Sequence, residues 1–428
     1  MTINKITSGL LLLFMIAVGN CQGVVASESK LTVSSMEKTL DRVSSYPVLC
    51  WNIYPDAVIY EMDIALAKDF STQSIIFHST SVYVAGYQPD LSQWQGHTLF
   101  YRVRPLNYDR KPIDQWSNIT EIRVDYPENF AKFRPVTVSK WSEVTPILYP
   151  AYSWIPVFGA EKYQVEIYSV DKSATTESGN RYQLLSSHQV EGSLTAEWYD
   201  EVARVGNFAW RVQAFKGNGQ PIGLPSTLEE FTLEAVPRQF ALGVYGDSIM
   251  HGGGAVSGSP ADFCYSLHAY LTGSAINLAK SGDTSAVSLS RFDKDVVPFS
   301  PQTLLILTGI NSIRGGEKSE NVIRDLTEIY NKCMEKHITP VFLTLPPVNP
   351  ARIELIFNEA TATDWAIERN KVNQYIVQNL PCLDIAPLFV DRDGTMPVKW
   401  STDGLHPDSK AKKTIADMFN RSCFNNMY

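Results

Sequence analysis

The sequence is poor in cysteine and lacks the motifs that usually hold a metal ion or a nucleotide. Its six cysteines form no Cys-x-x-Cys pair, and neither His-Glu-x-x-His nor Gly-Lys-Ser/Thr occurs in the chain. These absences argue against structural zinc, a zinc hydrolase and a phosphate-binding loop. Apart from Cys21, the cysteines are widely spaced, which predicts mostly buried thiols and leaves one disulfide open: Cys50, Cys264, Cys333, Cys382 and Cys423.

Long runs of charge of one sign are also absent. The formal net charge of -8 is spread over 428 residues. A protein that binds nucleic acid through its phosphates usually gathers lysine and arginine on one face. We therefore predict no nucleic-acid partner.

The first 26 residues differ in composition from the rest of the chain. Lys5 precedes an apolar run from Leu10 to Val18, and small residues follow up to Ala26. This order is typical of a cleaved signal peptide, and the run is much shorter than the roughly 20 residues that a membrane-spanning helix needs. We predict a signal peptide over 1–26 and an exported protein that is secreted, periplasmic or attached to the cell surface. Cys21 leaves lipid anchoring open.

Two stretches in the first half of the chain repeat each other. WNIYPDAVIYEMDI begins at Trp51 and WIPVFGAEKYQVEI begins at Trp154, with an alanine and a tyrosine at matching positions. Further on, LFYRVRPL matches FAWRVQAF, and all four stretches alternate polar and apolar residues as half-buried strands do. The repeat predicts two antiparallel β-sandwiches in tandem, over 44–128 and 129–236, after a linker over 27–43.

The repeated pattern resembles fibronectin type III modules. Trp51 and Trp154 take the core position of an early strand, and Tyr101-Arg102-Val103 and Trp210-Arg211-Val212 look like a late central strand. The resemblance implies two all-β modules. They either hold the rest of the chain away from a surface or bind a glycan or a protein at the cell surface.

After residue 236 the hydrophobic pattern becomes continuous. FALGVYGD, AINLA, TLLILTG, PVFLTLP and CLDIAP are short apolar runs typical of strands buried on both faces, and they alternate with an amphipathic segment over 261–271 and a long helical pattern over 317–337. This alternation predicts a parallel sheet with helices on both faces, a three-layer αβα, flavodoxin-like domain over 237–428. In such domains the chemistry collects at the carboxyl ends of the strands.

Ser248, in VYGDSIMHGGG, directly follows the first of these runs. The stretch matches neither the Gly-x-Ser-x-Gly elbow nor a dinucleotide-binding loop. A serine that leaves a strand and enters a helix has a backbone N–H and the positive end of a helix dipole beside it, but it needs a base to act as a nucleophile. His406 is the predicted base, because Asp403 three residues earlier can hold its ring. His251 is predicted to be a wall residue of the pocket.

Two further residues are predicted to stabilise a tetrahedral oxyanion. Gly282 in AKSGDTS lets a backbone N–H approach a ligand closely, and Asn311 in LTGINS carries a side-chain amide. Both follow predicted strands. With the backbone N–H of Ser248 they would supply three donors to one oxygen atom.

Taken together, these blocks resemble the SGNH hydrolases, also called the GDSL esterase/lipase family. Gly-Asp-Ser-Ile places the nucleophile of the family on Ser248, its second and third blocks fall on Gly282 and Asn311, and its Asp-x-x-His falls on Asp403 and His406. The resemblance covers about residues 238–428 and implies acyl transfer to the serine without a cofactor.

Two positions depart from the family pattern. Ile249 replaces the usual leucine, which is a conservative change in packing. Ser312 follows Asn311 where the family usually has aspartate, and this changes the hydrogen bonding expected for that loop.

The resemblance leaves the substrate open, because the family includes carbohydrate esterases, lysophospholipases, thioesterases and lipases. Predicted export and tandem β-modules favour a short-chain or acetyl ester on a carbohydrate or a cell-envelope glycan. The alternatives are a lipid-directed acylhydrolase and a non-catalytic surface-binding protein. The segment over 346–365 is expected to cap the crevice, with Phe357 and Trp365 as further candidates for the substrate pocket.

Overall fold

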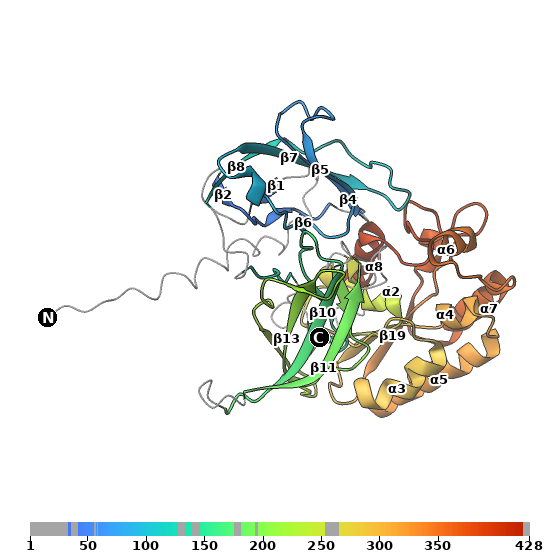
Figure 1. The fold of residues 1–428 in the computed structure, drawn as a ribbon. Helices are drawn as coiled ribbons and strands as arrows, with labels where there is room; N and C mark the ends of the chain where they lie inside the picture. The colour runs from blue at the N-terminus through green and yellow to red at the C-terminus, as the bar shows by residue number, and fades with distance from the viewer. Residues whose placement is uncertain are drawn as a thin grey trace.

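The structure is a computed structural model, and it describes residues 33–35, 42–54, 57, 59–126, 133–138, 146–174, 181–192, 196–252 and 265–422. The predicted signal peptide and Cys21 lie outside these residues. Within them, no helix has both the length and the apolar character needed to cross a membrane. Figure 1 shows two parts built of strands, followed by a part in which strands and helices alternate.

The first part contains two sheets. In one, the order is β1 (Val33–Ser35), β3 (Leu49–Trp51) and β6 (Gly86–Tyr87). In the other, the order is β2 (Arg42–Ser44), β8 (Thr120–Tyr126), β7 (Thr98–Leu106), β4 (Ile59–Ala65) and β5 (Ile75–Val82), and a 3-10 turn lies over Ser92–Trp94. The predicted linker over 27–43 is corrected by this pairing, because it contains β1 and most of β2. Strands of three residues are too short to leave a periodic pattern in the sequence.

The second part also has two sheets. In the smaller one, β9 (Ala151–Ser153) pairs with β12 (Glu197–Tyr199). The larger one runs β11 (Tyr182–Glu191), β10 (Lys162–Val170), β13 (Gly206–Phe215) and β14 (Pro221–Ile222), with β15 (Glu229–Leu233) also paired to β13. The described residues before 237 contain no α-helix, in agreement with the alternating pattern.

The sequence repeat is also a structural repeat. The ring centroids of Trp51 and Tyr60 lie 5.4 Å apart, and those of Trp154 and Tyr163 lie 5.1 Å apart. Each tyrosine hydroxyl accepts a hydrogen bond from the backbone N–H of the residue six positions earlier, at 2.8 Å and 2.9 Å. The same aromatic pair therefore anchors the same turn in both modules.

The third part is a five-stranded parallel sheet in the order β17 (Ala275–Asn277), β16 (Leu242–Gly246), β18 (Thr303–Leu307), β19 (Thr339–Leu343) and β20 (Cys382–Leu383). Continuous apolar strands suit this sheet, because all five residues of both β16 and β18 are buried. The predicted parallel α/β architecture is confirmed. From β16 the chain crosses to β17 on one side of the sheet, and from β18 it crosses to β19 on the other side. Such folds open a crevice between two strands whose connections lead to opposite sides, here β16 and β18.

Helices cover both faces of this sheet (Figure 1). α3 (Ser285–Asp295), α5 (Ser319–Glu335) and α7 (Trp365–Asn379) pack in a row, and α8 (Ser409–Arg421) packs with a 3-10 turn over Leu267–Ala269. The described part of the amphipathic segment 261–271 contains that turn and no α-helix. Short elements follow the strand ends: α2 (Ser248–His251), α4 (Ile310–Arg314), α6 (Pro350–Phe357) and a 3-10 turn over Ala386–Phe389.

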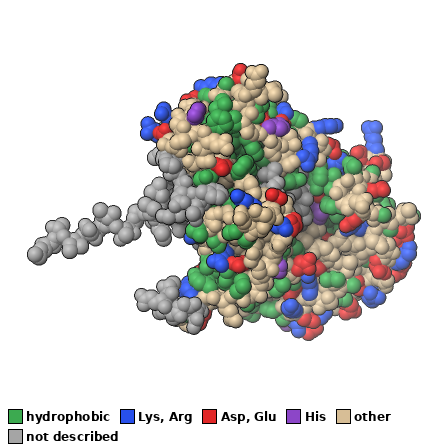
Figure 2. Space-filling model, in the orientation of Figure 1, with side chains coloured by type: hydrophobic (Ala, Val, Ile, Leu, Met, Phe, Trp, Pro, Cys, Tyr) green, Lys and Arg blue, Asp and Glu red, His purple; other side chains and the backbone are tan. Residues whose placement is uncertain are grey.

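Charged side chains of both signs are intermixed over the α/β part on the face that Figure 2 shows. No band of lysine and arginine gathers there. This distribution agrees with the even spread of charge along the sequence.

Candidate active site

Ser248 is presented at the carboxyl end of β16 by a tight turn. Gly246 has φ +138°, and a Cβ at this position would lie 1.7 Å from the carbonyl oxygen of Leu307 on β18. Only glycine allows the strand to end so close to its neighbour. Asp247 then caps α2, since its carboxylate accepts the backbone N–H of Ile249 at 2.9 Å. Ser248 is therefore the first residue of a helix, with only 6% of its surface exposed.

The structure brings Ser248, His406 and Asp403 together in one hydrogen-bonded chain. His406 Nε2 lies 2.8 Å from Ser248 Oγ, and His406 Nδ1 lies 2.8 Å from Asp403 Oδ2. With its Nδ1 proton donated to the carboxylate, the imidazole leaves Nε2 free to accept the serine proton. The three side chains have the geometry of a nucleophile, a general base and the group that orients the base.

Asp403 is held by more than the histidine. Its Oδ1 accepts hydrogen bonds from Ser401 Oγ at 3.1 Å and from the backbone N–H groups of Leu405 and His406, both at 2.8 Å. Burial pulls the pKa of Asp403 upwards, but the charge of His406 and these hydrogen bonds outweigh burial and hold it below its usual range. The carboxylate is thus ionised and fixed in orientation.

Helix α6 packs against the loop that carries the base. Asn349 N donates to Gly404 O at 2.7 Å, and Arg352 Nε and Nη2 donate to Thr402 O at 3.1 Å and 2.7 Å. Gly404 has φ +84°, and a Cβ there would lie 2.6 Å from the Arg352 Cβ. The Phe357 ring meets His406 edge to face, with centroids 6.0 Å apart. Helix α6, which lies within the predicted cap over 346–365, therefore supports the loop that carries Asp403 and His406.

The other two pocket candidates lie in the interior. Trp365 opens α7, is 7% exposed and packs in the core of the α/β part with Arg369 over its ring. His251 has no exposed surface, and its Nε2 lies 2.7 Å from the carbonyl oxygen of Tyr149. Of the three predicted pocket residues, only Phe357 borders the triad; helix spacing cannot distinguish a core aromatic residue from a pocket one.

The two predicted donors follow β17 and β18, the strands on either side of β16. Gly282 follows β17 in a left-handed conformation, φ +85°, with no atom within 4 Å of where a Cβ would stand. Asn311 lies in α4 after β18, and its Nδ2 donates to Asp283 O at 3.0 Å while its Oδ1 accepts from Arg314 Nε. An amide nitrogen carries two hydrogens, so one remains to bind an oxyanion.

Ser312 preserves the hydrogen bonding of this loop although the residue is not aspartate. Its Oγ accepts the backbone N–H of Ser285 at 3.0 Å. The hydroxyl of Ser285 donates in turn to Asp325 Oδ2 on α5, at 2.7 Å. The hydroxyl of Ser285 thus links this loop to the carboxylate of Asp325 on α5.

We expect replacement of Asn311 by alanine to lower kcat by roughly 10²- to 10³-fold with little change in KM, because one oxyanion donor is removed. Initial rates on a p-nitrophenyl ester measure this. Asn331→Ala, at an exposed position of α5, is the matched control. Equal kcat in the two variants would show that the Asn311 amide does not face the reacting oxygen.

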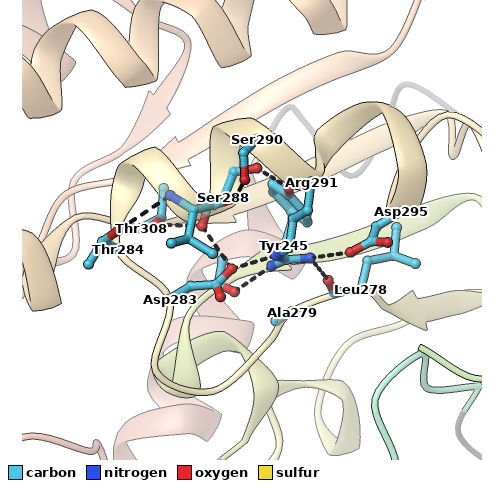
Figure 3. A network of polar contacts seen from close by, with 12 residues as sticks. Tyr245, Leu278, Ala279, Asp283, Thr284, Ser288, Ser290, Arg291, Asp295 and Thr308 are labelled. Atoms are coloured by element: carbon cyan, nitrogen blue, oxygen red, sulfur yellow. Dashed lines mark hydrogen bonds and ion pairs between the residues drawn. The ribbon is translucent and has the colours of Figure 1, made fainter. Parts of the chain in front are cut away.

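A buried arginine that the sequence patterns did not reveal holds the ends of two strands (Figure 3). Arg291 on α3 donates to Gly246 O at 2.9 Å and to Leu278 O at 2.8 Å, and it forms ion pairs with Asp283 and Asp295. Gly246 and Asp283 flank the segments that carry Ser248 and Gly282. In the sequence, only the position of Arg291 on the buried face of an amphipathic helix could have indicated that it binds the strand ends.

Lys412 on α8 contacts α2, the short helix that begins at Ser248. It is 1% exposed, and its Nζ donates to the carbonyl oxygen of Ile249. Burial lowers the pKa of Lys412 and raises the pKa of the buried Asp247, while attraction between the two charges opposes both shifts. The lysine therefore links the helix after His406 to the helix that begins at Ser248.

Two buried histidines predict a loss of stability in acid. Burial lowers the pKa of His251 to about 3 and of His268 to about 4, whereas an unfolded chain protonates histidine near pH ~6.5. Stability is therefore fully present above about pH 6.5 and is lost as pH falls towards the folded-state values, by about 2 kcal/mol per histidine at about pH 5. Urea unfolding above about pH 6.5 and at about pH 5 should show a smaller loss of unfolding free energy for His268→Gln than for wild type. Equal losses would contradict the role of His268 in the acid sensitivity.

The comparisons with known proteins point to one family. Residues 244–413 match the model of the GDSL-like lipase/acylhydrolase family, a range that contains the triad and both donors. A search of the curated proteins gives no match.

Solved structures that match this chain each cover less than half of it. A putative acylhydrolase from Bacteroides fragilis NCTC 9343 is 21% identical, over 45% of this chain and 90% of its own, with a TM-score of 0.35. A lipase/acylhydrolase from Enterococcus faecalis is 22% identical, over 43% and 95%, with a TM-score of 0.35. A GDSL-like lipase from Bacteroides thetaiotaomicron VPI-5482 is 17% identical, over 44% and 88%, with a TM-score of 0.35.

Proposed function

We propose that this protein, whose residues 244–413 match the model of the GDSL-like lipase/acylhydrolase family, is a serine esterase that forms an acyl-enzyme on Ser248. The observation that carries the proposal is the hydrogen-bonded chain from Ser248 Oγ through His406 to Asp403. It gives a serine hydroxyl a base at the carboxyl edge of a parallel sheet.

The reaction uses these residues and water. Ser248 Oγ attacks the ester carbonyl carbon while His406 Nε2 takes the hydroxyl proton. The N–H groups of Ser248 and Gly282 and the Asn311 amide bind the oxygen that becomes negative. The tetrahedral intermediate then breaks its bond to the alcohol, which leaves with the proton from His406. Water attacks the acyl-enzyme by the same steps and releases the acid.

The substrate we propose is a short-chain or acetyl ester on a carbohydrate or a cell-envelope glycan, met by an exported enzyme. Tyr108, from the first β-module, supports a ring-bearing alcohol. Tyr108 is half-buried and directly precedes Asp109, whose carboxylate accepts from Arg352 Nη1 at 3.0 Å. Arg352 also binds Thr402 O beside Asp403, so this aromatic residue lies close to the catalytic loop. Aromatic faces are common packing surfaces for apolar and ring-shaped ligands.

A lipid-directed acylhydrolase is the second candidate. Leu355 on α6 is 66% exposed, two residues before Phe357. An exposed leucine on the helix that also carries Phe357 would suit a long acyl chain better than a glycan.

The β-modules are proposed to be fibronectin type III-like. The support is the division of each into two sheets, antiparallel except where β2 pairs with β8 in parallel, and the repeated tryptophan and tyrosine pair. Such modules could also bind a glycan or protein at the cell surface.

Chain-length selectivity tests the proposed function. Residues 27–428 should hydrolyse p-nitrophenyl acetate faster than the butyrate and octanoate esters, and should release acetate from acetylated glycans. Exclusive activity on long-chain lipid esters would favour the second candidate. Equal, background rates for wild type and Ser248→Ala on every ester would indicate a non-catalytic binding protein.

A further inference from the structure

The second β-module continues into the α/β part without a spacer. Residues 146–148 of this module run beside β17: Leu148 N donates to Asn277 O, and Asn277 N donates to Pro146 O, both at 2.9 Å. Leu148 and Leu233 belong to the same buried cluster as the α/β core. This module is therefore fixed at the edge of the sheet where the Gly282 loop begins.

One tyrosine of the second module reaches the oxyanion loop. Tyr199, on β12, lays its ring against His251, with centroids 5.0 Å apart and planes at 83°. Its hydroxyl oxygen accepts the backbone N–H of Ser281 at 3.1 Å. Ser281 directly precedes Gly282, so the contact fixes the peptide that leads into the predicted donor.

Gly282 depends on such neighbours for its position. It is exposed, its backbone is left-handed, and nothing lies within 4 Å of a Cβ built there. A glycine in open space has no side chain to hold it. Hydrogen bonds on either side supply the restraint: Tyr199 holds the N–H of Ser281, and Asn311 holds the carbonyl oxygen of Asp283.

The first β-module holds the other catalytic loop in a similar way. Asp109 lies at the tip of a turn closed by the backbone pair Asn107 N to Lys111 O at 2.9 Å. Asp109 Oδ1 accepts from Arg352 Nη1 at 3.0 Å, and the other nitrogens of Arg352 bind Thr402 O beside Asp403. Further along, the Tyr265 hydroxyl donates to Ala57 O of the first module at 2.9 Å.

We propose that the two β-modules are structural parts of the active site, in which Tyr199 is a positioning residue for the oxyanion loop and Asp109 is a positioning residue for the Asp403–His406 loop. The inference rests on the proposed esterase function for its kinetic readout. It goes beyond that function, because it makes the rate of the hydrolase domain depend on side chains from both modules.

The kinetic test removes one oxygen atom. Tyr199→Phe should lower kcat on p-nitrophenyl acetate by about 10-fold with KM changed less than about twofold, because small displacements of a catalytic donor cost rate more than binding. Tyr182→Phe is the matched control, since it also removes a hydroxyl hydrogen bond in the second module, from Tyr182 on β11 to Glu230. A Tyr199→Phe variant with the kcat of this control would overturn the proposal.

A double variant separates positioning from a general loss of stability. Tyr199 and Asn311 act on the same oxyanion, so Tyr199→Phe should cost much less in an Asn311→Ala background than in wild type. A merely destabilising substitution would lower the amount of folded enzyme by the same factor in both backgrounds. Equal factors would therefore contradict the role of Tyr199.

Hydrogen exchange gives a readout that needs no turnover. Peptides covering 278–285 should exchange faster in Tyr199→Phe than in wild type, while peptides of α5 should be unchanged. If wild type lacks esterase activity, the proposed function fails and this exchange still decides the positioning role. Unchanged exchange over 278–285 would overturn it.

The first module is tested by charge removal at the tip of its turn. Asp109→Asn should lower kcat by about two- to threefold, a small effect because exposed ion pairs are weak. Asp114→Asn, which removes the same charge in the same connection, should leave the rate unchanged. Equal rates for the two variants would remove Asp109 from the proposal.

Discussion

Replacement of His406 by asparagine is expected to lower kcat for p-nitrophenyl acetate by roughly 10⁶-fold, the largest loss of any substitution outside Ser248. The reason is that Ser248 Oγ has His406 Nε2 as its proton acceptor at 2.8 Å, and without it the hydroxyl stays protonated at neutral pH. Residual activity should come from the oxyanion donors and substrate binding alone.

His337 provides the matched control for this variant. It is exposed in the connection between α5 and β19, at the amino-terminal edge of the sheet, opposite to the strand ends that carry the site. His337→Asn removes an imidazole from the same domain and should retain the wild-type rate. If the two asparagine variants keep similar activity, another group is the base.

Replacement of Asp403 by asparagine is expected to lower kcat by roughly 10⁴-fold with the fold intact. Asp403 Oδ1 accepts three hydrogen bonds, so the carbonyl oxygen of an asparagine should take that place and turn its NH₂ group towards His406 Nδ1. A donor at that place favours the tautomer with the proton on Nε2, which can no longer accept the proton of Ser248.

Steady-state rates and urea unfolding together check this prediction. Asp293→Asn, which removes a carboxylate from an exposed position of α3, controls for the loss of charge. The Asp403→Asn variant should unfold cooperatively near the wild-type midpoint while its kcat falls. A fall in stability that accounts for the whole loss of rate would contradict the tautomer argument.

The sequence is most informative about the candidate site where local chemistry dictates local structure. Continuous apolar runs that end in Gly246 and Leu307 indicated buried strands, and the polar residues just after them had to lie at one edge of a parallel sheet. That reasoning predicts Ser248, Gly282 and Asn311 in one crevice. The short Asp-x-x-His spacing likewise gave the Asp403 and His406 contact.

The parts that the sequence did not predict depend on contacts between distant segments. Asp109 and Arg352 are 243 positions apart, and Tyr199 and Ser281 are 82 apart. No periodicity or motif encodes such pairs, because they follow from how whole sheets pack together. Trp365 shows a prediction that was wrong. Its place in the segment expected to cap the crevice indicated a pocket residue, but its ring packs into the core.

The central claim is that Ser248 is the nucleophile, and covalent labelling tests it most directly. A fluorophosphonate probe, which reacts with activated serines, is incubated with residues 27–428, and the adduct is located by peptide mass spectrometry. We expect one adduct on Ser248, much slower labelling of His406→Asn, and none of Ser248→Ala. Labelling of another residue, or equal labelling of Ser248→Ala, would contradict this claim.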